Sequence, residues 1–198
     1  GPVIILSEHS LAERAQNIRK PDLPSLNKEN RSIYSGSNGY LRYDSWELSP
    51  MPIPGGPGAY VANGSEHDGF GDTTHLASRH IQMSHRRFSK LKLLSDAKFE
   101  SKNNAAKVAI MPWGGSKGPG QEAYDLLTDE GFDLSWYYTM FLNPLPDGLL
   151  EELKTKDLVI VPELNFQGQF ANVLRGKRVK AEALTQYTGL PFKSNVLP

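Results

Sequence analysis

The sequence predicts an α/β fold whose largely parallel sheet is preceded by a long, ordered arm and one helix. From Ala105 onward, short apolar strands alternate with helices over short connections, which is typical of right-handed βαβ units. Residues 25–75 are rich in glycine and proline, yet they hold six aromatic side chains. Residues 76–102 contain neither glycine nor proline and have the composition of one long helix.

The chain begins with an expected strand and an expected helix. Residues 2–8 form a short apolar run with β-branched side chains, as in a buried strand. This strand either comes from a larger α/β domain or joins the later sheet, and the residues leave both readings open. Residues 9–19 have helical composition, and Pro21 forbids the helix from continuing.

The arm and the long helix come next. A glycine- and proline-rich stretch of this length is usually functional or disordered, and its aromatic side chains argue against disorder. We therefore expect residues 25–75 to pack on another surface, for instance another subunit. In residues 76–102, Ile81, Phe88, Leu91 and Phe99 recur at helical spacing. The other face is basic, and such a face is typically solvated.

The carboxy-terminal half carries the regular alternation. The expected strands are residues 107–111, 134–141, 158–161 and 178–183. The expected helices are residues 121–130, a helix capped by Asp147 that runs through Leu153, and residues 167–174. Gly131 stands where a glycine ends the first of these helices.

Composition excludes several classes of function. The 22 basic and 22 acidic residues balance, so strong affinity for nucleic acid or an anionic membrane is not expected. No apolar run approaches the ~20 residues that cross a bilayer, and no signal peptide is recognisable. The chain has no cysteine, which excludes disulfides, thiolate catalysis and cysteine-bound clusters on it. We expect a cytoplasmic protein without nucleic-acid or membrane partners.

One candidate site is a glycine-rich turn between a strand and a helix. Gly115, Ser116, Lys117 and Gly118 could bind an anion there, because free N–H groups and the helix dipole point outward. The turn lacks the spacing of a dinucleotide fingerprint or a Walker A loop. A tight βα turn without a ligand is the favoured interpretation.

A second candidate lies in the arm, where five residues resemble a cluster of metal ligands: Glu66, His67, Asp68, Asp72 and His75. Without cysteine these residues fix no coordination geometry, so structural hydrogen bonds are the favoured interpretation. His80 and His85 lack the i, i+4 spacing of paired ligands and are expected on the surface. No nucleophile elbow occurs, so the residues alone indicate no catalytic constellation.

Several segments resemble the alpha subunits of 2-oxoacid:ferredoxin oxidoreductases, which are thiamine-diphosphate enzymes. The residues that carry the resemblance are PVIILSE at 2–8, the arm at 41–71, WGGSKGP at 113–119, FLNPLPDGLLEEL at 141–153 and VPELNFQGQFANVLR at 161–175. The resemblance spans nearly the whole chain. It implies the carboxy-terminal portion of such a subunit, produced by engineering or proteolysis.

The resemblance also implies an architecture. Residues 1–8 would be the last strand of a truncated pyrimidine-binding domain, and residues 9–104 a connecting arm with a long helix. Residues 105–198 would be a three-layer sandwich like the carboxy-terminal domain of transketolase. An orphan strand exposes an unpaired edge, so we expect Val3 to Leu6 to pack on a neighbouring sheet.

The implied function belongs to a complex. It is oxidative decarboxylation of a 2-oxoacid, expected to be 2-oxoglutarate, to its acyl-CoA, with ferredoxin taking the electrons. Thiamine diphosphate, Mg and an iron–sulfur cluster would lie on a beta subunit or elsewhere, with gamma and delta subunits as further partners. The isolated chain is predicted to be inactive, with no catalytic, cofactor-binding or metal-binding residue.

Three residues of the arm are candidates for a subunit interface or a place beside the active site: Arg42, Tyr43 and His67. The alternative role of these residues is to hold the arm in place. The rival function for the whole chain is a stand-alone α/β protein that binds a small molecule or an anion through the Gly114–Gly120 loop.

Overall fold

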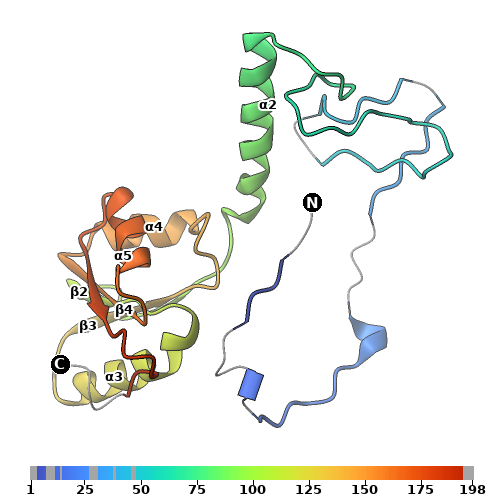
Figure 1. The fold of residues 1–198 in the computed structure, drawn as a ribbon. Helices are drawn as coiled ribbons and strands as arrows, with labels where there is room; N and C mark the ends of the chain where they lie inside the picture. The colour runs from blue at the N-terminus through green and yellow to red at the C-terminus, as the bar shows by residue number, and fades with distance from the viewer. Residues whose placement is uncertain are drawn as a thin grey trace. The chain divides into compact units, whose positions relative to one another are not determined.

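The computed structural model describes residues 4–7, 12–13, 15–26, 31–37, 39–45 and 48–193. The chain forms two compact units (Figure 1). Unit 1 comprises residues 1–16 and 94–198, and unit 2 comprises residues 17–93. The predicted division into residues 1–8, 9–104 and 105–198 stays a prediction.

Unit 1 is built on a five-stranded sheet with the order β1-β3-β2-β4-β5. Its strands are β1 (Glu100–Lys102), β2 (Val108–Ile110), β3 (Leu134–Tyr138), β4 (Leu158–Glu163) and β5 (Ala181–Thr185). All neighbouring pairs are parallel except β1 with β3, which is antiparallel. The predicted α/β fold with a mostly parallel sheet is therefore confirmed.

Three helices complete the layers of unit 1: α3 (Lys117–Asp129), α4 (Asp147–Lys154) and α5 (Gln169–Gly176). Alternate residues of β2 point to opposite faces, as the period of a strand requires. Ala109 packs in the larger core with α4 and α5, whereas Ile110 packs in the smaller core with Tyr124 of α3. The sheet thus lies between α3 on one side and α4 and α5 on the other (Figure 1).

The starts of α3 and α4 differ from the prediction. The turn η3 (Gly114–Ser116) runs directly into α3, which therefore begins at Lys117 rather than at residue 121. Pro119 is tolerated because the N–H groups of a first helical turn have no intrahelical partner. Asp147 is the first residue of α4 and makes no capping hydrogen bond, since Pro146 is the N-cap. The prediction that Asp147 caps this helix is wrong.

Gly131 is confirmed as the glycine that follows α3. Its φ angle is 95°, and its N–H donates to the carbonyl of Thr128 at 3.0 Å. The left-handed backbone there suits glycine, because a side chain would be strained. This turn sends the chain from α3 into β3.

The long helix of unit 2 is shorter than predicted. α2 covers Ala77–Ser89 and continues as the 3₁₀ turn η2 (Lys90–Leu94), so the predicted extension to residue 102 is wrong. Phe99 instead packs on the core of unit 1, with its ring centroid 6.5 Å from that of Tyr137. β1 follows directly and pairs with β3. Burial of Phe99 outweighs continuation of a helix whose last turns would be exposed.

The amino-terminal prediction is only partly covered by the described residues. Residues 4–7 form no strand, and the side chains of Ile4, Ile5 and Leu6 are exposed. Their packing on a neighbouring sheet stays a prediction, and Val3 lies outside the described residues. Ala12 and Glu13 are helical, but residues 15–20 are not, so the helix predicted to reach Arg19 ends earlier.

Candidate functional site

At the carboxyl edge of the parallel sheet, two neighbouring connections diverge to opposite faces. β2 leads to α3 on one face of the sheet, and its neighbour β4 leads to α5 on the other face. Open α/β sheets bind their ligands in the crevice where adjacent connections diverge in this way. Residues 111–116 and 164–168 form these two connections.

The first connection contains the predicted anion loop, and its polar side chains have partners within the chain. Ser116 is buried; its Oγ donates to the Trp113 carbonyl at 2.8 Å and accepts from the Trp113 N–H at 3.1 Å. Lys117 Nζ lies 2.6 Å from Glu100 Oε1 and 4.0 Å from the ring centroid of Tyr138. Gly115 and Gly118 are exposed. The contacts are those of a tight βα turn, and anion binding there stays a prediction.

The second connection is preceded by a buried carboxylate that the sequence patterns did not indicate. Glu163 at the end of β4 is 0% exposed. Its Oε2 accepts from the N–H of Phe170 at 2.9 Å and from Asn165 Nδ2 at 2.6 Å, and its Oε1 accepts from the N–H of Ala171 at 2.9 Å. The two N–H groups belong to the first turn of α5, where the helix dipole favours negative charge. Glu163 thus occupies the position at which a bound anion would lie.

The position of Glu163 decides whether this edge of the sheet fits the cofactors of the family that the sequence resembles. A diphosphate at the start of α5 would meet the negative charge of Glu163 and N–H groups that are already bonded. A cysteine-bound iron–sulfur cluster has no ligand anywhere in the chain, because the sequence contains no cysteine. The residues at this edge therefore fit neither group. Among the described residues, no three His, Asp or Glu side chains are grouped as metal ligands would be.

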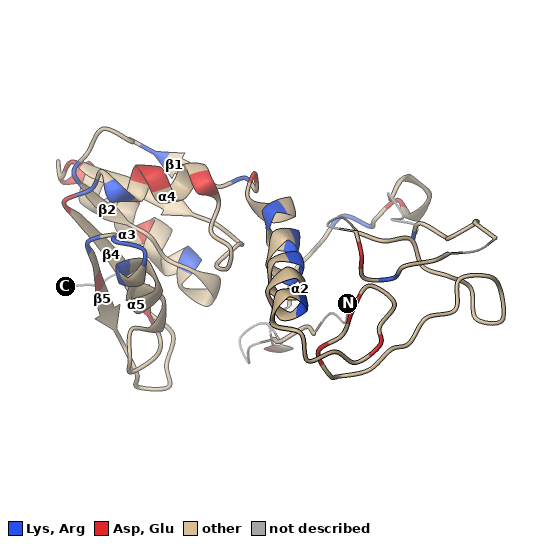
Figure 2. Cartoon of the chain, turned by 90° about the horizontal axis from the view of Figure 1, so that it is seen from above, with Lys and Arg blue, Asp and Glu red and all other residues tan. Residues whose placement is uncertain are grey.

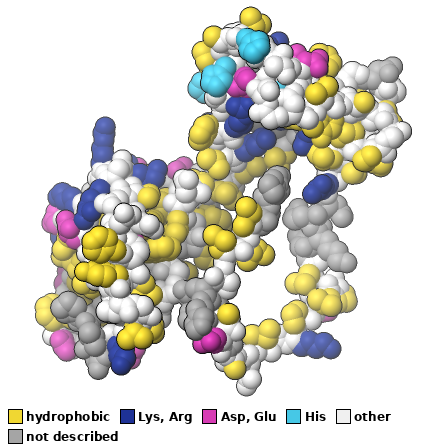
Figure 3. Space-filling model, viewed as in Figure 1, with side chains coloured by type: hydrophobic (Ala, Val, Ile, Leu, Met, Phe, Trp, Pro, Cys, Tyr) yellow, Lys and Arg dark blue, Asp and Glu magenta, His cyan; other side chains and the backbone are white. Residues whose placement is uncertain are grey.

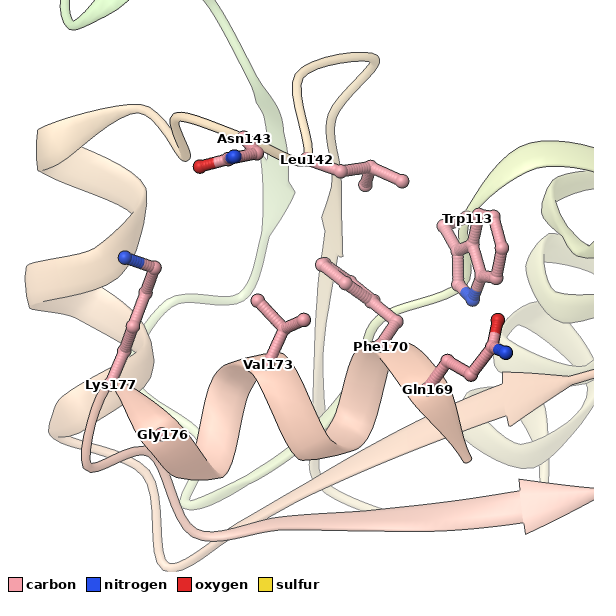
Figure 4. A pocket seen from close by; sticks show the side chains of 8 residues that line it. All are labelled: Trp113, Leu142, Asn143, Gln169, Phe170, Val173, Gly176 and Lys177. Atoms are coloured by element: carbon pink, nitrogen blue, oxygen red, sulfur yellow. The ribbon is translucent and has the colours of Figure 1, made fainter. Parts of the chain in front are cut away.

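An apolar groove of about 480 Å³ lies beside α5 (Figure 4). Phe170 and Val173 of α5 face Leu142 across it, and the Trp113 ring lies 6.0 Å from that of Phe170 at 55°. Lys177 stands at the end of the groove away from Trp113. Trp113 Nε1 is buried, and no hydrogen-bond partner for it occurs within the described residues. The groove suits an apolar group better than a charged one.

Unit 1 also buries a lysine. Lys156 is 2% exposed, and its Nζ donates to the carbonyls of Asn104 at 2.6 Å and Ala106 at 2.9 Å, and to Ser135 Oγ at 3.1 Å. Burial lowers the pKa of Lys156 from its ordinary value. The three contacts match the three donors of an ammonium group. Lys156 therefore joins the end of α4 to the segment before β2 and is not available as a nucleophile.

The three candidates in the arm come together in unit 2. The rings of Tyr43 and His67 lie 4.1 Å apart, and the Arg42 guanidinium lies 5.8 Å from the Tyr60 ring. Arg42 Nη1 also donates to the carbonyl of Ser49 at 2.9 Å. His67 is buried, with Nδ1 2.9 Å from the carbonyl oxygen of Asp68. These contacts hold the arm together, while a role at a subunit interface stays a prediction.

A basic residue of α2 completes this cluster, although its helical face was predicted to be solvated. Arg86 is 6% exposed, so that prediction is wrong for this residue. Its Nε donates to the carbonyl of Ser45 at 2.7 Å, and its guanidinium lies 5.6 Å from the Tyr43 ring. Its Nη2 reaches the carbonyl of Arg42 at 3.3 Å. Burial lowers the pKa of Arg86, and these contacts offset the cost of burying its charge.

The predicted structural hydrogen bonds of the acidic and histidine cluster are confirmed for its first members. Glu66 accepts from Arg87 Nη2 at 2.6 Å and also pairs with His80 Nδ1. The hydrogen bond from Arg87 is the main reason why the pKa of Glu66 falls to about 2. Asp68 Oδ1 accepts the N–H groups of Phe70, Gly71 and Asp72. Figure 3 shows histidine, acidic and basic side chains gathered at one end of unit 2.

His80 and His85 were predicted to lie on the surface, and both are exposed. His80 also contacts Glu66, which the spacing alone did not indicate. Together, Glu66, His80 and Arg87 line an open hollow of about 480 Å³ in unit 2. In the described part of the chain, no helix combines the length and the hydropathy that crossing a bilayer requires.

Comparison with known proteins identifies relatives of nearly the whole chain. No family model matches the sequence. The chain is 31% identical over 204 residues to the 2-oxoglutarate oxidoreductase subunit KorA of Mycobacterium tuberculosis, covering 96% of this chain and 30% of that subunit. It is 31% identical over 186 residues to the alpha subunit of 2-oxoacid:ferredoxin oxidoreductase 2 of Aeropyrum pernix, covering 88% of this chain and 29% of the subunit.

A solved structure supports the same relationship. The 2-oxoglutarate:ferredoxin oxidoreductase from Magnetococcus marinus, solved with 2-oxoglutarate, coenzyme A and succinyl-CoA bound, matches with a TM-score of 0.81 and 33% identity. The match covers 90% of this chain and 33% of that one. The chain thus spans about a third of the length of the relatives it matches. By sequence and by fold, it belongs to the alpha subunits of the 2-oxoacid:ferredoxin oxidoreductase family.

Proposed function

We propose that the chain is a structural and assembly segment of a 2-oxoacid:ferredoxin oxidoreductase complex, and that it is inactive alone. The buried Glu163 carboxylate carries this proposal. It fills the anion position at the carboxyl edge of the sheet, so the usual ligand-binding place of an α/β domain serves the fold instead. The similarity to an alpha subunit over 96% of the chain supports this structural role.

The chemistry of the proposed complex then lies outside the described residues. Thiamine diphosphate with Mg would supply the carbanion chemistry, and an iron–sulfur cluster on a cysteine-rich beta subunit would pass electrons to ferredoxin. 2-Oxoglutarate and coenzyme A are the proposed substrates, supported by the ligands of the Magnetococcus marinus structure. Gamma and delta subunits and a cytoplasmic location belong to the same proposal.

Affinity purification from a native extract tests the proposal. The tagged chain is expected to retain a cysteine-rich subunit, with thiamine diphosphate detected in the eluate by fluorescence after oxidation to thiochrome. The eluate, but not the chain alone, is expected to reduce a viologen dye when 2-oxoglutarate and coenzyme A are added. Retained protein that contains no thiamine diphosphate and has no 2-oxoacid-dependent activity would contradict the proposal.

Two variants test the rival function, in which the chain by itself binds a small molecule or an anion through the Gly114–Gly120 loop. Lys117→Ala removes the cation of this loop, whereas Phe170→Ala enlarges the neighbouring groove beside α5. On the proposed function, neither variant changes the binding of inorganic phosphate by the chain, because the chain does not bind it. Saturable phosphate binding that Lys117→Ala abolishes would favour the rival.

A further inference from the structure

An asparagine followed by a glycine lies in an exposed loop of the arm. Asn63, Gly64 and Ser65 are all exposed. The backbone nitrogen of the residue after an asparagine can attack the side-chain carbonyl carbon, Cγ, and close a succinimide ring. Glycine at that position favours the attack, because it has no Cβ to crowd the ring and its backbone reaches conformations that other residues rarely adopt.

The space around Gly64 is open. Apart from the adjoining residues, no heavy atom lies within 4 Å of the position that a Cβ would take at Gly64. The surrounding chain therefore does not obstruct the movement of the Gly64 nitrogen toward Asn63. The same open space means that an alanine at this position meets no steric clash.

A hydrogen-bond donor already contacts the oxygen on which charge develops in this reaction. The Ser65 N–H donates to Asn63 Oδ1 at 2.7 Å. Attack on Cγ moves negative charge onto Oδ1, and a donor that is already in place stabilises such charge. The loop thus places a nucleophile, an electrophilic carbon and a donor within three consecutive residues.

The amide nitrogen of Asn63 holds the loop closed. Its Nδ2 donates to the carbonyl of Gly71 at 2.5 Å, and the Val61 N–H donates to the carbonyl of Phe70 at 3.3 Å. Loss of Nδ2 would leave a carboxylate oxygen facing the Gly71 carbonyl oxygen. Because two acceptors cannot bond to each other, the link across residues 61–71 would be lost.

The change would also add negative charge to the arm. Asn63 lines the same hollow as Glu66, His80 and Arg87. Figure 2 shows basic residues along α2 and acidic residues in the loops of the arm. A carboxylate at position 63 is ionised at neutral pH and would compete with Glu66 for Arg87.

We propose that Asn63 is a site of spontaneous deamidation, and that the reaction loosens the loop of residues 61–71. The Gly64 nitrogen loses its proton as it bonds to Cγ, and the bond from Cγ to Nδ2 breaks, so Nδ2 leaves as ammonia. Water then opens the succinimide at either of its carbonyl carbons and gives aspartate or isoaspartate. One water is consumed for each ammonia released, and no oxidant or cofactor takes part. The inference goes beyond the proposed function, because it concerns a chemical change of the arm itself.

Peptide mapping by mass spectrometry tests the reaction after incubation of the folded chain in mildly alkaline buffer. The peptide that contains Asn63 is expected to gain the mass difference between an amide and an acid, with isoaspartate present beside aspartate. Gly64→Ala is expected to slow this reaction by roughly ten-fold or more, because alanine restricts the backbone at the attacking nitrogen. The sequence has a second such pair, Asn38 and Gly39, which this variant leaves intact. Asn38 lies outside the described residues, and its reaction serves as the reference rate in both proteins.

A variant that imitates the product tests the structural consequence. In Asn63→Asp, hydrogen exchange of residues 61–71 is expected to become roughly ten-fold faster, because the bond to the Gly71 carbonyl is lost. Asn172→Asp is the matched control in unit 1. Its Nδ2 also donates to a backbone carbonyl, that of Gln167 at 3.0 Å, and the variant should leave exchange of residues 61–71 unchanged.

Three results would overturn the inference. The first is an Asn63 peptide that keeps its mass in the folded chain but reacts once the chain is unfolded in urea. The second is an equal rate at Asn63 in the wild type and in Gly64→Ala, and the third is unchanged exchange of residues 61–71 in Asn63→Asp. These measurements use the chain alone, so their failure is distinguishable from failure to retain a cysteine-rich subunit, which tests the proposed function.

Discussion

The two units of this chain are stabilised by different kinds of contact. Unit 1 has an apolar core on each face of its sheet, and Trp136 in one core and Leu149 and Leu153 in the other are fully buried. Among its described residues unit 2 has one α-helix, and its arm is held by tyrosine rings, loop hydrogen bonds and the buried Arg86. The stability of unit 1 therefore depends on buried apolar area, whereas the stability of unit 2 depends on a few directional contacts. Unit 2 is therefore the part that a partner can most readily stabilise further.

The largest expected effect is in the core of unit 1. Trp136→Ala removes a side chain that is 0% exposed and packs 5.8 Å from the Tyr124 ring. The free energy of unfolding is expected to fall by about 4 kcal/mol, because the buried ring is replaced by a cavity. Urea denaturation measures the loss. Phe132→Ala, at an exposed position just before the same strand, is the control and should cost under about 1 kcal/mol.

The second effect concerns the internal carboxylate. Glu163→Gln keeps the shape of the side chain but replaces one acceptor oxygen with an amide donor, which then faces an N–H group of α5. The free energy of unfolding is expected to fall by about 2 kcal/mol. Glu151→Gln, whose carboxylate is 72% exposed, is the control and should cost at most about 0.5 kcal/mol. Equal costs for the two variants would show that Glu163 does not organise the start of α5.

The third effect is confined to unit 2 and directly tests whether the two units are stabilised separately. Arg86→Met leaves the carbonyls of Ser45 and Arg42 without their buried donor, at a cost of about 2 kcal/mol for local opening. Hydrogen exchange of residues 40–45 is expected to become roughly 30-fold faster, while exchange of β4 stays unchanged. Arg79→Met is the control, since Arg79 donates to Gln82 of the same helix. Faster exchange in both units would contradict their separate stabilisation.

The smallest effect is the pH dependence of the contact between the arm and α2. Arg87 lowers the pKa of Glu66 from its ordinary value of 4.5 to about 2. The stabilisation from this ion pair is therefore fully present above pH 4.5 and is lost as the pH falls through 2. Between these values, protection of the amides of residues 66–72 should fall more steeply in the wild type than in Glu66→Gln. Parallel profiles for the two proteins would contradict the role of this carboxylate.

The sequence predicts the parts of the fold that depend on periodic apolar residues. The strands around Val108 and Val159, and the helix that follows each of them, are predicted by apolar runs and by the spacing of apolar residues in the sequence. β1 was missed because Glu100–Lys102 has three exposed residues and no apolar pattern. The end of α2 was misplaced because neither glycine nor proline marks it. Phe99 lies beyond the end of the helix because it packs on a core whose other residues lie further along the sequence.

Residues of the candidate sites were predicted only where their partners lie close to them in the sequence. Arg42, Tyr43 and His67 were found together because they share one arm, and they do meet there. Glu163 was overlooked because its partners lie in the next helix, although an acidic residue at the end of a buried strand was the available signal. Arg86 could not be distinguished from its solvated neighbours, since its burial depends on an arm about 40 residues away in the chain.

Calorimetric titration of the chain with Mg²⁺ and thiamine diphosphate tests the central claim most directly. The proposed function predicts no saturable heat of binding, because the protein's own carboxylate fills the anion position of the sheet and the cofactor would be held by other regions of the proposed complex. Saturable binding at one site per chain, with a micromolar Kd, would contradict it.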